Sequence, residues 1–152
     1  MYRIEPVGPH HAPGLRLALD RVVRAPHQPR LAEVTARIAE SIARDEVRWV
    51  ATVAHEVVGW CDIVVGAEAS GQLEIAVLSD YRGRGIGRAL LEKALARAWQ
   101  HGIAEVVWSV APTDQAGLAL AQQLGFRAHE AAGPAYRDSQ SVRVLSLLRP
   151  TH

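Results

Sequence analysis

Hydrophobic and polar residues follow two different periods along this chain. Short apolar or alternating stretches predict strands at residues 2–7, 48–54, 57–65, 73–78, 103–110 and 141–148. Apolar residues three or four positions apart predict helices at residues 13–23, 31–44 and 86–99. Thr113 or Asp114 is expected to cap a fourth helix that ends at Gln123, and His55-Glu56 is expected to turn the chain between the second and third strands.

The most informative stretch joins the strand at 73–78 to the helix that begins near Ile86. The turn between them, Ser79–Gly87, holds three glycines that alternate with arginines and one isoleucine. Glycines let the backbone curl closely around an anion, and the first amides of a helix have no partners within that helix. Arginines add forked donors that match phosphate oxygens. The turn therefore predicts a site for a phosphorylated ligand, whereas the plainer alternative is a β–turn–helix whose glycines serve only the turn.

Two common phosphate-binding motifs do not fit this turn. The dinucleotide fingerprint Gly-x-Gly-x-x-Gly needs a third glycine, but Gly85-Ile86-Gly87 is followed by Arg88, Ala89 and Leu90. A nucleotide P-loop needs Gly-Lys-Ser/Thr, and Gly87 is followed by Arg88 and Ala89. Both motifs are excluded by the residues that are present.

A third motif does fit. Residues 82–87, Arg-Gly-Arg-Gly-Ile-Gly, match Arg/Gln-x-x-Gly-x-Gly/Ala, and the wider run 75–91 resembles the central motif of the GCN5-related N-acetyltransferases. Ser79 stands where that family usually has proline, while 49–63 and the Leu-Gly-Phe step at 124–126 resemble its other segments. The resemblance implies an α+β fold with a mixed central sheet of about six to seven strands and about four flanking helices. It also implies one domain over residues 1–152.

The resemblance implies acetyl-CoA as co-substrate and a primary amine of a small molecule or protein as acceptor. By the family's pattern, the central strand pairs with the pantetheine arm and the turn takes the pyrophosphate. Asp114 aligns with a family asparagine and is expected to cap its helix or to contact the coenzyme. The residues so assigned to the coenzyme are Ile75, Ala76, Val77, Arg82, Gly83, Arg84, Gly85, Ile86, Gly87, Arg88 and Asp114.

The family's best-known acid and base are missing. Ala121 stands where many members carry the tyrosine that protonates the thiolate, and Ser109 stands where some carry a glutamate base. Glu74 is a candidate base, with a solvated strand residue as the alternative, and Tyr136 is a candidate acid, with a packing or exposed residue as the alternative. These departures leave a second function open, a non-catalytic acyl-CoA-binding module that acts as a sensor or subunit.

Composition narrows the kinds of partner, compartment and metal site that the protein is expected to have. The chain has 152 residues, enough for one domain, and its net charge of +1 does not suggest a nucleic-acid partner. Cys61 is the single cysteine, and no apolar run approaches the length of a membrane span. The seven histidines show no metal-binding spacing, so no metal site is expected. We therefore expect a cytoplasmic protein without a membrane partner, and the resemblance makes a homodimer plausible.

Overall fold

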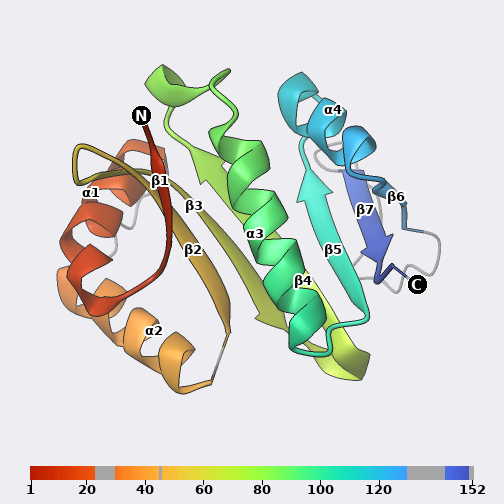
Figure 1. Ribbon diagram of the computed structural model, residues 1–152, viewed down its shortest axis with the longest axis horizontal. Helices are drawn as coiled ribbons and strands as arrows, with labels where there is room; N and C mark the ends of the chain where they lie inside the picture. Colours follow the sequence, from red (N-terminus) through yellow and green to blue (C-terminus); the bar gives the residue numbers. More distant parts are fainter. Residues whose placement is uncertain (23–29, 45, 130–142, 151–152) are drawn as a thin grey trace. The chain divides into compact units, whose positions relative to one another are not determined.

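The computed structural model describes residues 1–22, 30–44, 46–129 and 143–150 (Figure 1). Over these ranges the strands are β1 (Arg3–Pro6), β2 (Val47–Val53), β3 (Glu56–Val65), β4 (Ser70–Val77), β5 (Glu105–Val110), β6 (Arg127–Ala128) and β7 (Arg143–Leu148). The helices are α1 (Ala12–Val22), α2 (Leu31–Ala43), α3 (Ile86–Gln100) and α4 (Gln115–Gln123), and the short 3-10 helices are η1 (Pro9–His11), η2 (Ala67–Ala69) and η3 (Ser79–Tyr81).

The strands form a mixed sheet in the order β1-β2-β3-β4-β5-β7-β6. Strands β4 and β5 are parallel, whereas β1 pairs with β2, and β7 pairs with both β5 and β6, in antiparallel fashion. Seven strands and four helices in the described residues confirm the α+β fold expected from the sequence.

The chain forms two compact units. The first comprises residues 1–62 and 75–97, and the second comprises residues 63–74 together with the described residues from 98 onward. Strands β3 and β4 and helix α3 each contribute residues to both units. The single domain over residues 1–152 remains a prediction.

In the first unit, helices α1 and α2 pack together and α1 lies directly on β3. A Cβ atom at Gly14 of α1 would lie only 2.8 Å from Cγ2 of Val57, so glycine permits this close approach. The unit's core is apolar and includes Ala18, Val34, Ile38, Val50, Ala51, Val58, Ile86, Leu90, Leu91 and Ala94. Burial of these apolar side chains, more than helix propensity, stabilises helices as short as α1 and α2.

The hairpin between β2 and β3 turns one residue earlier than expected. Its central residues are Ala54 and His55, with φ angles of 49° and 69°, and Glu56 already belongs to β3. Two successive positive φ angles are typical of the two-residue turns whose twist matches that of paired strands. The prediction of His55-Glu56 was wrong because Ala54 gives no sequence signal for a positive φ angle, while the pairing of β2 with β3 sets the position of the turn.

An ion pair ties β2, β3 and α2 together in the first unit. Nε of Arg48 donates to Oδ1 of Asp62 at 3.0 Å, and the Arg48 guanidinium also donates to the Arg37 carbonyl at 3.3 Å. The two charged side chains are only 21% and 15% exposed. Next to this pair, burial and the Asp62 charge raise the pKa of the Cys61 thiol, which keeps the thiol protonated at neutral pH.

In the second unit, Ser70–Leu73 of β4 pair with Glu105–Trp108 of β5. This parallel pairing extends β4 three residues upstream of the expected start at Leu73, through a glycine and two polar residues. A Cβ atom at Gly71 would lie 2.5 Å from Cγ2 of Ile63, so this position too requires glycine.

No helix in the described residues is long and apolar enough to span a bilayer.

Candidate functional site

The glycine-rich turn lies between the end of β4 and the start of α3, in the first unit. Gly83 and Gly85 have φ angles of +76° and +81°, a region that residues with side chains rarely adopt. The Ala89 amide donates to the Gly85 carbonyl at 3.1 Å, which begins the hydrogen-bonding of α3. Ile86, 1% exposed, anchors the first helical turn in the core. The predicted strand, turn and helix N-terminus are therefore confirmed, and the two glycines have the conformation for which they were singled out.

The arginines of the turn are exposed, and each makes a local contact. Nε of Arg82 donates to the Val77 carbonyl at 3.3 Å, which closes the turn on the end of β4. The Arg84 guanidinium lies 5.0 Å from the centre of the Tyr81 ring. Nε of Arg88 bonds to Glu92 at 2.8 Å, one helical turn along α3. These contacts hold three positive charges around the N-terminus of α3, where the helix dipole also favours an anion.

The last residues of β4 lie beyond its ladder with β5. The paired residues end at Leu73, whereas Ile75, Ala76 and Val77 follow and are half-buried. The apolar run was expected to form a buried strand, but only Leu73 and Leu78 at its ends are buried. Strand backbone beyond a ladder offers amides and carbonyls that a bound molecule can pair with.

The candidate catalytic residues differ in where they lie in the structure. Glu74 is exposed on β4, immediately after the last residue paired with β5. Tyr136 lies outside the described residues. Ser109 is exposed on β5, and Ala121 is completely buried in α4. Neither residue has the tyrosine hydroxyl or the glutamate carboxylate that the family uses as acid or base. Glu74 and Tyr136 remain predictions.

Asp114 caps the N-terminus of α4, which confirms the first of its two expected roles. Its Oδ1 atom accepts from the Gly117 amide at 2.9 Å, and its carbonyl accepts from the Leu118 amide at 3.0 Å. A Cβ atom at Gly117 would lie 2.5 Å from Oδ2 of Asp114, so the small residue leaves room for the cap. The alternative role of Asp114, a contact with the coenzyme, remains a prediction.

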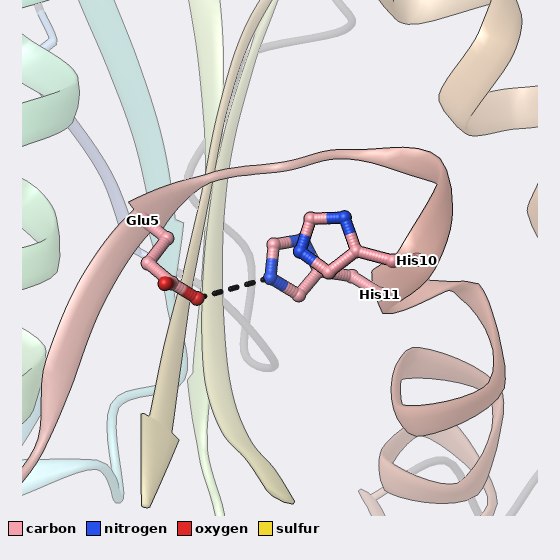
Figure 2. Close-up of side chains that lie close together, drawn as sticks. All are labelled: Glu5, His10 and His11. Carbon is pink, nitrogen blue, oxygen red and sulfur yellow. Dashed lines mark hydrogen bonds and ion pairs between the residues drawn. The ribbon is translucent and has the colours of Figure 1, made fainter. Parts of the chain in front are cut away.

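Three potential metal ligands, Glu5, His10 and His11, lie together in the first unit (Figure 2). Their ligand atoms lie within 4.8 Å of one another. Sequence spacing missed this group because Glu5 comes from β1 and the histidines come from η1. They line an open cavity of about 550 Å³ that also touches Tyr2 and Thr52.

Hydrogen bonding shows what this group does in the present arrangement. The Gly8 amide donates to Nδ1 of His11 at 2.9 Å, so Nε2 of His11 carries the proton and donates to Glu5 at 3.1 Å. A metal ligand needs a free lone pair, and both nitrogens of His11 are engaged. Glu5 and His11 therefore link β1 to η1, and His11 would have to give up its bond from Gly8 before it could bind a metal.

Comparisons with known proteins agree with the fold and with the glycine-rich turn described above. A family model described as the acetyltransferase (GNAT) family matches residues 16–126, more than half of the chain. No match is found among curated protein sequences. Solved structures, in contrast, give matches over nearly the whole chain.

Three of these structures show the likeness of fold. An acetyltransferase of the GNAT family from Streptococcus pneumoniae has a TM-score of 0.83 at 21% identity, covering 97% of this chain and 99% of that one. The protein yncA from Salmonella typhimurium, solved with its cofactor acetyl-CoA, has a TM-score of 0.84 at 14% identity, covering 99% and 95%. A PaiA N-acetyltransferase from Thermoplasma acidophilum, solved with coenzyme A, has a TM-score of 0.78 at 14% identity, covering 98% and 99%. By the family model and the shared fold, the chain belongs to the GNAT family of acetyltransferases.

Proposed function

We propose that this protein is an N-acetyltransferase that moves an acetyl group from acetyl-CoA to a primary amine of a small molecule or a protein. The observation that carries the proposal is the turn after β4, where Gly83 and Gly85 take left-handed conformations beside three arginines at the N-terminus of α3. Such a turn suits a pyrophosphate. The matched family and the acetyl-CoA bound to yncA support the same coenzyme.

In this proposal the coenzyme binds along the end of β4 and around the turn. Backbone groups of Ile75, Ala76 and Val77 pair with the pantetheine arm, and amides from Gly83 to Arg88 receive the pyrophosphate. The guanidinium groups of Arg82 and Arg84 add positive charge beside it. By the family's pattern, Asp114 is proposed as a further residue that contacts the coenzyme.

Direct attack in a ternary complex accounts for the reaction. The acceptor nitrogen must lose its proton to attack the thioester carbonyl, and the thiolate then leaves and takes up a proton. We assign the first step to Glu74 and the second to Tyr136. Alignment of the two substrates supplies much of the rate enhancement over the uncatalysed reaction. The reaction therefore does not require the family's tyrosine and glutamate.

Thermal unfolding with separate additions of acetyl-CoA, coenzyme A, NAD and ATP tests the coenzyme. A ligand at 100 times its dissociation constant adds about 2.7 kcal/mol of apparent stability. For a chain of this size that increase raises the Tm by roughly 5–10 °C. We expect this rise with acetyl-CoA and coenzyme A only. No rise from a folded sample, or an equal rise with NAD or ATP, would contradict the proposal.

Replacing Glu74 by glutamine tests catalysis. The amide has the shape of the carboxylate but cannot take a proton at neutral pH, so we expect kcat for an amine substrate to fall by roughly 100-fold. The dissociation constant for acetyl-CoA should stay unchanged. Release of free coenzyme A across a panel of amines gives kcat, and Glu56→Gln, at an exposed glutamate of β3, is the matched control. Equal rates for Glu74→Gln and wild type would remove Glu74 from the mechanism.

The second candidate function is a non-catalytic acyl-CoA-binding module. It is favoured by Ala121, which is fully buried where many relatives carry the catalytic tyrosine, and by Ser109 at a usual glutamate position. Acetyl-CoA binding without release of coenzyme A for any amine in the panel would support this alternative over the enzyme.

A further inference from the structure

The side chain of Tyr2 reaches the glycine-rich turn from the start of β1. A Cβ atom at Gly85 would lie 3.9 Å from the hydroxyl oxygen of Tyr2, and no other atom outside its chain neighbours comes within 4 Å of it. Tyr2 directly precedes β1, and both it and the turn belong to the first unit. Figure 1 shows the N-terminus beside the segment that leads into α3. The fold thus brings a phenol hydroxyl from a distant part of the sequence to the turn.

The hydroxyl of Tyr2 has no hydrogen-bond partner in the part of the chain that the structure describes. Its residue is half-buried, and a tyrosine hydroxyl in such a place usually finds a partner. The turn's own arginines, in contrast, are already engaged, with Arg82 on the Val77 carbonyl and Arg88 on Glu92. Tyr2 therefore offers the turn a donor that the described chain does not use.

The amides of the turn are also without partners. Across the described residues, the N–H groups of residues 83–87 donate to no acceptor, and the first bond into α3 runs from Ala89 to Gly85. A Cβ atom and the nitrogen on the same Cα are about 2.5 Å apart, so the Tyr2 oxygen lies within about 6.5 Å of the Gly85 nitrogen. Two hydrogen bonds of about 2.8 Å, made to two oxygens of one phosphate, can span that distance.

We infer that the Tyr2 hydroxyl is a further donor to the pyrophosphate of the coenzyme. The amides of the turn bind one oxygen of a phosphate group, and Tyr2 donates its O–H to another oxygen of the same group. Hydrogen bonds to a charged oxygen are shorter and stronger than those between neutral groups, so one hydroxyl has a measurable effect on affinity. The inference rests on the proposed function, in which this turn holds the pyrophosphate.

Replacing Tyr2 by phenylalanine tests the contact, because it removes the hydroxyl and keeps the ring. Calorimetry should show that Tyr2→Phe binds coenzyme A roughly 10-fold more weakly than the wild type does. The hydroxyl has no partner among the described residues, so the Tm of the free protein should stay the same. Equal affinities of the variant and the wild type for coenzyme A would overturn the inference.

Two shorter ligands locate the contact on the coenzyme. Dephospho-coenzyme A lacks the 3′-phosphate but keeps the pyrophosphate, so Tyr2→Phe should weaken its binding by the same factor. Pantetheine lacks the pyrophosphate, so the variant and the wild type should bind it equally. A loss of affinity that disappears with dephospho-coenzyme A, or that persists with pantetheine, would contradict the inference. Wild-type protein that does not bind coenzyme A would instead refute the proposed function itself, so the two failures are distinguishable.

Discussion

Valine at Gly85 should weaken acetyl-CoA binding by about 100-fold, which corresponds to roughly 2.7 kcal/mol. Gly85 has a φ of +81°, and a β-branched residue in this region costs on the order of 1–3 kcal/mol. The turn can relieve that strain only by changing its backbone conformation. The amides at the start of α3 would then no longer converge on one anion, so binding should suffer together with stability.

Gly102 offers a matched control for this change. It also has a φ of +81°, it follows the end of α3, and no atom lies within 4 Å of its would-be Cβ. Gly102→Val should therefore lose a similar amount of stability and keep its affinity for acetyl-CoA. Calorimetric dissociation constants and urea denaturation of both variants check the prediction. Equal affinities for the two variants would mean that the turn does not hold the pyrophosphate.

Replacing Arg48 by alanine should lower the free energy of unfolding by about 3 kcal/mol, because it removes one partner of a largely buried ion pair. Arg48 bonds to Asp62 at 3.0 Å and to the Arg37 carbonyl at 3.3 Å, so the change breaks contacts with both β3 and α2. Asp62, only 15% exposed, would lose the guanidinium that balances its charge. Urea denaturation measures the loss directly.

An exposed ion pair in the same unit supplies the comparison. Arg44 pairs with Glu40 on α2, and their side chains are 65% and 58% exposed. Water and salt screen such a pair, so Arg44→Ala should cost at most about 0.5 kcal/mol. If the two variants were equally destabilised, burial would not be what makes the Arg48–Asp62 pair matter.

Local patterns in the sequence predicted the glycine-rich turn between β4 and α3 well. Strand, glycines and amphipathic helix follow one another within 28 residues, from Gln72 to Trp99, and each depends on its own residues and their near neighbours. The left-handed φ angles of Gly83 and Gly85 belong to this local information, because glycine alone adopts them without strain. The cap of α4 by Asp114 was predictable for the same reason.

Predictions were less successful where residues far apart in the chain meet. Strand β4 begins at Ser70 because parallel pairing with β5 includes residues whose own pattern does not suggest a strand. The turn at Ala54-His55 was placed one residue late because the pairing of β2 with β3 sets its position. Glu5, His10 and His11 come together only because η1 folds back toward β1.

The sequence by itself therefore determined the fold family, the turn that suits a pyrophosphate and the absence of the family's tyrosine and glutamate from their usual positions. These features depend on residue identity and short-range backbone preference. Only the tertiary structure decided that the Tyr2 hydroxyl lies near Gly85, that Arg48 is paired with Asp62 and that His11 is held by Gly8 and Glu5. Each of these depends on a distance across the fold, which no local pattern in the chain encodes.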